Sequence, residues 1–374
     1  MGRLLPLVVY LPAGVAIVGG IHYYLWARLV RDVGFGPTTA FGLKALLVFL
    51  AASVPLGVIA SRLVPYRWSV WWLEPIYLWL GTSMLLAMGL AVMELLPITT
   101  SRASSAAVVL VMGLGAAALA AHEARRVRVE RVEIPLRKLP REFDRLRLVQ
   151  LSDLHIGQTL GRAFLEEVVS QVNALAPDAV LITGDLVDGR VADIAADIAP
   201  LAALTSTYGT FFVTGNHEYH ADAPEWCEHL GKLGVRVLRN EHVALERAGQ
   251  VLHLAGIDDY EAAHFDVGHG PDLARAVEGR DRSKVLILMA HQPKAVQEAV
   301  RHGVDLQLSG HTHGGQFWPL RWLLRAGQPV VDGLRRVGDT LVYVSRGTGH
   351  SGPPMRLGVP PEMTEIVLRS EDDV

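Results

Sequence analysis

Cysteine is almost missing from this sequence. Cys227 is the single cysteine among 374 residues, and one thiol can form neither an internal disulfide nor a thiolate metal cluster. Charge is also scarce: 20% of residues are charged and the formal net charge is -3 at pH 7, which disfavours bulk electrostatic binding to nucleic acid. Any metal ligands must therefore be His, Asp, Glu or Asn, and no nucleic-acid partner is expected.

Apolar residues are abundant and concentrated in the first third of the chain. They make up 50% of the sequence, and the mean hydropathy is +0.27. Four apolar stretches are each long enough to cross about 30 Å of hydrocarbon at about 1.5 Å per residue. They run from Leu4 to Ala27, Pro37 to Ala60, Glu74 to Glu94 and Arg102 to Glu123. We therefore expect a membrane module with four transmembrane helices over residues 1–122. A cleavable signal peptide is the alternative for the first stretch, but its apolar region is long and three more spans follow.

The distribution of arginine predicts the orientation of this module. Four spans place both ends of the module on one side of the membrane, and arginines are more numerous on that side. They are Arg3, Arg62, Arg67, Arg125, Arg126, Arg128 and Arg131, against Arg28, Arg31 and Arg102 on the other side. The positive-inside rule then predicts a multi-pass protein of the cell membrane with its C-terminal region in the cytoplasm.

Beyond the spans, the composition changes abruptly. Residues 123–147 alternate charged and small apolar residues, which predicts a juxtamembrane connector with an edge strand and a Pro-bounded turn. We interpret it as a solvated segment, with a specific anionic-lipid site as the alternative. Residues 148–374 are long enough for one two-layered α/β domain.

Short β-branched runs alternate with helical patterns in this domain. The first half reads LRLVQLSD, a helix near Arg162 to Ala174, AVLITGD, a helix near Val191 to Leu204, and TFFVTGNHE. Five later runs are predicted to be the strands of a second half: VLHLAGIDD, VLILMAHQP, DLQLSGHTHGG, LVYVSRGTG and MTEIVLRS. Successive βα units place functional residues at the carboxyl ends of their strands.

Polar residues that can bind metals follow five of these strands. They are Asp153 and His155, Asp185, Asn216 and His217, His291, and finally His311 and His313. A single histidine at a strand end is more often structural, so the prediction of a metal centre depends on their convergence. Carboxylate, imidazole and amide groups suit Mn²⁺, Fe, Zn²⁺ or Mg²⁺, and the lack of cysteine argues against a closed structural zinc site. Even seven of these eight residues are too many ligands for one ion, which indicates two divalent ions.

Five motifs in order carry a resemblance to a known family. DLHIG, GDLVD, GNHE, AHQP and GHTHGG resemble the calcineurin-like metallophosphoesterase family over roughly Val127 to Arg369, and in particular its bacterial membrane-associated subgroup. The resemblance implies a four-layer α/β/β/α sandwich with a dinuclear site, preceded here by the four-helix transmembrane module.

The resemblance also implies a role for each site residue. The implied metal ligands are Asp153, His155 and His313 for the first ion, Asn216, His291 and His311 for the second, and Asp185 as a bridge. His217 is implied to be catalytic near the leaving group, with the alternative that it only orients Asn216. Glu218 is expected to accept a hydrogen bond from a histidine ring nitrogen. A metal-bridging hydroxide would attack the phosphorus.

Two further segments bear on the substrate. The segment SRGTGHSGPPMRLG resembles the closing loop of the family, so Arg346 and Arg356 are candidates for phosphate contact, although His350 stands where a small residue is expected. A second segment places Trp318, Trp322, Leu323 and Leu324 soon after two expected ligands. This segment either packs over the core of the domain or forms a wedge at the bilayer interface, with Arg321, Arg325, Arg335 and Arg336 meeting phosphate.

These observations favour an enzyme. We expect a membrane-anchored, metal-dependent hydrolase of phosphodiester or pyrophosphate bonds, acting on a lipid-linked or nucleotide-linked substrate. The expected cofactors are two divalent ions (Mn, Fe, Zn or Mg), and the expected partners are the lipid bilayer and a phosphate ester. The alternative is a non-enzymatic membrane sensor with a metal- or nucleotide-binding domain. The helices could also serve as an oligomerisation or docking unit.

Overall fold

The chain forms two compact units. The computed structural model describes residues 5–64, 66–97, 100–265, 268 and 270–371. The first unit comprises Met1–Glu123 together with Gly352–Leu357, and the second comprises Ala124–Ser351 with Gly358–Val374. Arg3 and Leu4, which entered the sequence predictions, lie outside the described residues.

Long apolar helices dominate the first unit. They are α1 (Leu5–Trp26), continued by a π-helical turn η1 (Ala27–Arg31), α2 (Pro37–Leu63), α3 (Tyr66–Leu95) and α4 (Arg102–Glu123). Four helices in the described part are long and apolar enough to cross a membrane, which confirms the four apolar helices that the sequence predicts. The third helix begins earlier than the apolar stretch that predicts it, so Trp68, Trp71 and Trp72 lie within its first turns.

Close packing and one polar pair join the helices of this unit. Leu25, Leu86 and Val109 form a buried cluster between α1, α3 and α4. The Trp79 indole donates a hydrogen bond to His22 Nε2 at 2.8 Å, so the polar ring within α1 has a partner on α3. The buried His22 ring is thereby satisfied without water.

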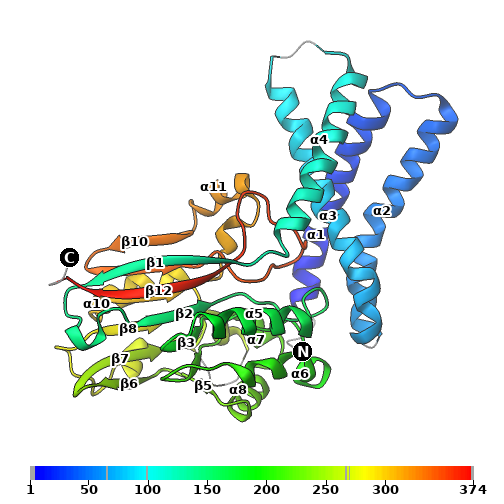
Figure 1. Cartoon of the computed structure of the whole chain (residues 1–374). Helices are drawn as coiled ribbons and strands as arrows, with labels where there is room; N and C mark the ends of the chain where they lie inside the picture. The colour runs from blue at the N-terminus through cyan, green and yellow to red at the C-terminus, as the bar shows by residue number, and fades with distance from the viewer. Residues whose placement is uncertain (1–4, 65, 98–99, 266–267, 269, 372–374) are drawn as a thin grey trace. The chain divides into compact units, whose positions relative to one another are not determined.

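The second unit contains two six-stranded sheets (Figure 1). The first has the order β1 (Arg128–Leu136), β12 (Glu362–Ser370), β2 (Arg147–Leu151), β3 (Ala179–Ile182), β4 (Thr210–Phe212) and β5 (Val235–Val237). The second has the order β10 (Gly333–Val337), β11 (Thr340–Val344), β9 (Leu306–Ser309), β8 (Leu286–Met289), β7 (Gln250–Gly256) and β6 (Glu241–Arg247). The predicted two-sheet α/β domain is therefore confirmed.

The placement of the last strand corrects one prediction. MTEIVLRS belongs to the first sheet, where β12 runs parallel to β1 and antiparallel to β2. Its partners, Arg128–Leu136 and Arg147–Leu151, lie more than two hundred residues earlier in the chain. The prediction that it belongs to the second half is wrong because a hydrophobic run identifies a strand without identifying its neighbour. The strand expected in the connector is β1, and it lies at the edge of the sheet.

Helices cover the outer faces of both sheets. The helices are α5 (Arg162–Ala174), α6 (Val191–Ile198), α7 (Asn216–His220), α8 (Ala223–Lys232), α9 (Leu273–Ala276), α10 (Val296–Arg301) and α11 (Arg321–Leu324). The 3-10 turns are η2 (Arg141–Phe143), η3 (Ala199–Ala203), η4 (Tyr260–His264), η5 (Pro293–Ala295), η6 (His313–Gly315) and η7 (Trp318–Leu320). Helices α5, α6 and α8 connect the parallel strands β2 to β5, while α9 and α10 pack on β7 and β8. The helix predicted near Val191 to Leu204 changes to 3-10 geometry at Ala199, next to Pro200.

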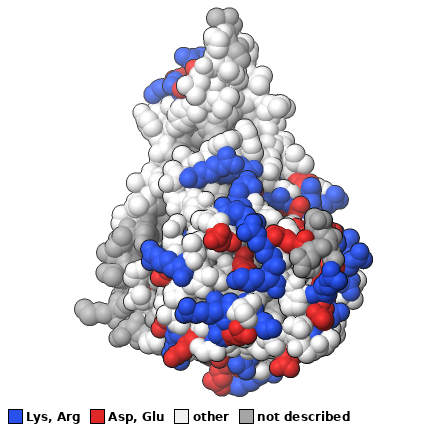
Figure 2. All heavy atoms as spheres, turned by 90° about the vertical axis from the view of Figure 1, so that its left-hand side faces the viewer, with Lys and Arg blue, Asp and Glu red and all other residues white. Residues whose placement is uncertain are grey.

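Charged side chains of both signs share the surface. Figure 2 shows lysine and arginine interspersed with aspartate and glutamate over one face. Ion pairs in the second unit include Arg131 with Glu365 at 2.9 Å and Arg369 with Asp144 at 3.2 Å. These two pairs are part-buried, since Glu365 is 5% exposed and Arg369 is 21% exposed, and they join β12 to the segments beside it.

The core lies between the two sheets. Leu148, Leu181 and Ile366 of the first sheet meet Ile287 and Leu308 of the second in one buried cluster. Alternate residues of each strand point into this layer, as the period of two requires. The carboxyl ends of the strands are thereby held in a fixed relation to one another.

We predict that Ile366→Ala destabilises the catalytic unit by about 2–5 kcal/mol, since it leaves a cavity between the sheets. Val129→Ala is the control, because Val129 is 45% exposed on β1 and its truncation should cost less than about 0.5 kcal/mol. Urea unfolding of the full chain, followed by near-ultraviolet circular dichroism, measures both. Equal shifts of the two midpoints would contradict the central placement of β12.

Candidate metal centre

The predicted ligands follow the carboxyl ends of strands from both sheets. Asp153 and His155 follow β2, Asp185 follows β3, Asn216 begins α7 after β4, His291 follows β8, and His311 and His313 follow β9. Strands β2, β3 and β4 run parallel to one another, and so do β8 and β9. The carboxyl ends within each set therefore lie at the same edge of their sheet. Side chains from two sheets therefore meet at one edge of the sandwich.

An unusual backbone turns these side chains inward. Five of the predicted ligands have left-handed backbone angles: Asp153 (φ 54), His155 (φ 49), Asp185 (φ 51), His311 (φ 72) and His313 (φ 51). Non-glycine residues rarely adopt this conformation, and each instance costs of order 1–3 kcal/mol. At Gly184 (φ +87) a Cβ atom would lie 2.7 Å from both Gly215 N and His291 Nδ1. Glycine is therefore required there, because backbone and imidazole approach it closely.

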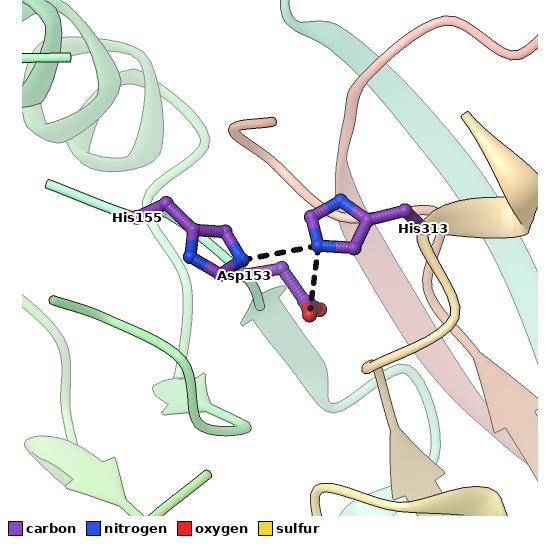
Figure 3. Close-up of side chains that lie close together, drawn as sticks. All are labelled: Asp153, His155 and His313. Carbon is purple, nitrogen blue, oxygen red and sulfur yellow. Dashed lines mark hydrogen bonds and ion pairs between the residues drawn. The ribbon is translucent and has the colours of Figure 1, made fainter. Parts of the chain in front are cut away.

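The first cluster joins β2 to the segment after β9. The side chains of Asp153, His155 and His313 point toward one another (Figure 3). His155 Nε2 lies 3.0 Å from His313 Nε2, and His313 Nε2 lies 3.5 Å from Asp153 Oδ1. Because two ring nitrogens and a carboxylate oxygen converge on one point, the arrangement suits a cation.

The second cluster has the same character. His291 Nε2 lies 3.2 Å from Asn216 Oδ1, and His311 Nδ1 lies 3.0 Å from the same oxygen. Asp185 Oδ2 lies 3.2 Å from His291 Nε2 in this cluster and 3.9 Å from His155 Nε2 in the first. One carboxylate oxygen thus faces both clusters, which fits the predicted bridging role.

Burial and charge agree with metal binding. Asp153 and Asp185 are 0% and 2% exposed, and ionised carboxylates are costly to bury without a compensating cation. Burial raises the pKa of Asp153. Burial, together with nearby His291, lowers the pKa of His311 to about 3, so its ring is neutral and able to ligate. Nitrogen and oxygen donors of this kind fit two borderline or hard divalent ions.

Asp188 is a site residue that the sequence analysis missed. Its Oδ1 atom lies 2.8 Å from His155 Nδ1 and 2.7 Å from His217 Nδ1. Burial raises the pKa of Asp188, but His155 and His217 outweigh it and hold the pKa well below the usual range. The ionised carboxylate fixes the orientation of both rings, so that their Nε2 atoms face the centre. Its position at the end of the quoted motif GDLVD was the available signal.

His217 lies beside the clusters and remains accessible. Its side chain is 32% exposed, and its Nε2 atom lies 4.0 Å from Asp185 Oδ2. Burial lowers the pKa of His217, but Asp185 and Asp188 outweigh it and raise the pKa to about 10. The ring is therefore protonated near neutral pH and can donate a proton to a bound group.

Glu218 has a different role from the one expected. Its carboxylate accepts hydrogen bonds from the backbone N–H groups of Asp185 at 3.0 Å, Leu186 at 2.8 Å and Gly215 at 2.6 Å. The prediction that it accepts from a histidine ring is wrong, because the third residue of helix α7 caps its own N-terminus and the neighbouring loop. Burial and the proximity of Asp185 raise the pKa of Glu218 to about 7. Glu218 positions the backbone that carries the bridging carboxylate.

The two arginine candidates lie in different surroundings. Arg346 pairs with Glu130 at 2.9 Å and with Glu362, so acidic side chains already neutralise its guanidinium. Arg356 is fully buried in the segment Gly352–Leu357, which clusters with the apolar helices, and its backbone N–H donates to Ala120 O at 2.8 Å.

Comparison with known proteins agrees with this geometry. Residues 146–315 match the family described as Calcineurin-like phosphoesterase. An uncharacterized metallophosphoesterase of Aquifex aeolicus is 33% identical over 66% of this chain and 93% of its own length. The chain therefore belongs to the calcineurin-like metallophosphoesterase family.

Other similarities extend to proteins described as membrane-bound. A "Transmembrane protein with metallophosphoesterase domain" of Danio rerio is 45% identical over 64% of this chain. The chain spans 56% of the length of that relative. Among solved structures, a dimetal phosphatase from Danio rerio has 13% identity and a TM-score of 0.38, covering 55% of this chain and 88% of that one.

We predict that Asp188→Asn lowers the metal affinity by about 10–100-fold, because the amide no longer stabilises the His155 ring as a carboxylate does. The metal occupancy at a given metal concentration falls accordingly. Metal analysis after dialysis against graded Mn²⁺ measures the change. Asp193→Asn is the control, since Asp193 pairs only with Arg190 at 3.4 Å among the ion pairs of the described residues. Unchanged affinity in Asp188→Asn would refute the orienting role.

Proposed function

We propose that this membrane-anchored metallophosphoesterase hydrolyses phosphodiester or pyrophosphate bonds. The observation that carries this proposal is the position of Asp185 between two clusters of metal-binding side chains, with the accessible His217 ring, held by Asp188, beside them. A site that only bound metal would not need an accessible acid at its rim.

The roles follow from the contacts. One ion would be held by Asp153, His155 and His313. The other would be held by Asn216, His291 and His311. Asp185 would bind both ions. Two divalent ions supply charge that screens the phosphoryl oxygens and makes hydroxide available near neutral pH. The ligands contain no sulfur, which suits Mn, Fe, Zn or Mg.

His217 supplies the chain's own acid catalysis. Asp188 holds its Nδ1 atom at 2.7 Å, which leaves Nε2 directed toward the site. The protonated Nε2 can donate its proton to the leaving oxygen as the bond to phosphorus breaks. Asp188 then keeps the ring in this orientation between turnovers.

The substrate and the side of the membrane are further parts of the proposal. We assign the substrate to lipid-linked or nucleotide-linked phosphate esters, with Arg346 as a candidate contact; Arg356 is set aside because it is fully buried. The names of the Danio rerio and Bos taurus relatives include "Transmembrane protein", and similar metallophosphoesterases occur in the bacteria Helicobacter pylori and Aquifex aeolicus. The arginine distribution supports a cytoplasmic catalytic domain.

The alternative is a membrane sensor without activity. It is disfavoured because His217, which Asp188 holds in place, is an acid that metal binding does not require. Two bound ions without turnover of either a phosphodiester or a phosphomonoester would favour this alternative.

We predict that chelation abolishes hydrolysis of bis(p-nitrophenyl) phosphate by the full chain in detergent, and that added Mn²⁺ restores it. Both changes follow from the loss and return of the screening charge. The release of nitrophenolate gives the rate, and metal analysis gives the ion content of the same samples. Turnover that persists in metal-free protein would refute the proposal.

We predict that two substitutions separate acid catalysis from metal binding. His217→Ala should lower kcat by about 10²–10⁴-fold, the usual contribution of a general acid, with both ions retained. Asp185→Asn should lose metal, because a neutral amide replaces the bridging carboxylate.

The matched control for His217→Ala is His264→Ala, whose ring is exposed and pairs with Glu261 at 3.0 Å. This control should keep both rate and metal. Equal metal loss in His217→Ala and Asp185→Asn would show that the two roles are not divided in this way.

A further inference from the structure

A small apolar surface stands out on the second unit. It consists of Trp318, Trp322 and Leu323, which are 53%, 57% and 72% exposed, together with Arg325. We call this surface the α11 patch. Large apolar side chains that are exposed side by side commonly mark an interaction surface.

The patch is not a displaced part of the core. The same loop buries Phe317 at 4% exposure and both Val330 and Val331 at 5%. Leu324, the last residue of α11, is half-buried. The loop therefore supplies other apolar residues to the interior. Trp322 and Leu323 lie on the outer side of the short helix α11.

The patch is also fixed close to the metal centre. A Cβ atom on Gly315 would lie 2.7 Å from Arg321 N, so the start of α11 rests against the turn that carries His313. Arg321 is held in place by Asp332, with contacts of 2.7 and 2.8 Å. Whatever covers the patch therefore lies near a residue of the first cluster.

An arginine borders the patch. The guanidinium of Arg325 lies 4.3 Å from the centre of the Trp322 ring, and Arg335 and Arg336 are exposed further along the chain on β10. Asp332 is committed to Arg321. An indole stacked by arginine combines an apolar face with a positive charge, which matches the layer where acyl chains meet anionic headgroups.

The chain itself supplies such a layer. Only residues 124–127 separate the end of α4 from the start of β1, so the domain stays within a short chain length of the membrane that holds the helices. We infer that the α11 patch docks on a bilayer surface with anionic headgroups. A phosphate carried by a lipid would then be presented beside the metal centre, a consequence that rests on the proposed function.

The docking itself can be tested without turnover. The full chain carrying Cys227→Ser and Leu323→Cys is labelled with an environment-sensitive nitrobenzoxadiazole dye and placed, one chain per disc, in nanodiscs containing phosphatidylserine. The matched control places the same dye at Lys232→Cys, because Lys232 is 68% exposed on α8. Lipid-borne nitroxide and soluble iodide serve as quenchers.

We predict that the dye at position 323 shows blue-shifted emission, quenching by the lipid nitroxide and protection from iodide, while the control dye shows the reverse. Replacing phosphatidylserine by phosphatidylcholine should reduce the blue shift. A dye at position 323 that behaves like the control would overturn the inference. Protection from both quenchers would also overturn it, because protein would then cover the patch.

A kinetic experiment separates this inference from the proposed function. Trp322→Ser with Leu323→Ser should lower hydrolysis of a phosphodiester carried on a vesicle lipid several-fold, with bis(p-nitrophenyl) phosphate hydrolysis unchanged. Parallel loss of both activities would count against docking. An unaltered chain that is inactive on both substrates would refute the proposed function, while the fluorescence experiment would still decide the docking.

Discussion

The structure depends on one buried carboxylate. Asp185 is 2% exposed, and its Oδ2 atom lies 3.2 Å from His291 and 3.9 Å from His155. A carboxylate in this position requires neighbouring positive charge, because its burial alone is strongly unfavourable. The two clusters on either side provide places for that charge. Electrostatic attraction at the strand ends therefore acts together with apolar packing to hold the two sheets together.

Neighbouring residues fix the positions of the metal-binding side chains. Glu218 holds the backbone on which Asp185 stands, and Asp188 orients one ligand ring and one acidic ring together. Gly184 permits the close approach of Gly215 and His291. The contacts of Glu218 are buried and that of Asp188 with His155 is half-buried, so they hold the strained ligand backbone in place.

A bilayer imposes the second constraint on the molecule. In the first unit, the buried His22 ring finds its partner inside the protein, because Trp79 donates a hydrogen bond to it. The second unit has an ordinary charged surface with intermixed signs (Figure 2), yet it exposes Trp322 and Leu323 beside arginine. A phosphoesterase with such a surface combines a site for phosphate with a surface suited to lipid.

The sequence by itself determined the four spans, the strand ends and the types of ligand. Spans and strands are encoded by local patterns of hydropathy, and residues at the ends of parallel strands must meet at one edge. The tertiary structure alone decided that β12 lies beside β1 and β2, that Glu218 binds backbone, and that Asp188 serves both His155 and His217. It also decided that Trp322 faces outward while Phe317 is buried. Such choices depend on contacts between residues far apart in the chain, and no local pattern specifies which distant partner a strand, carboxylate or ring will find.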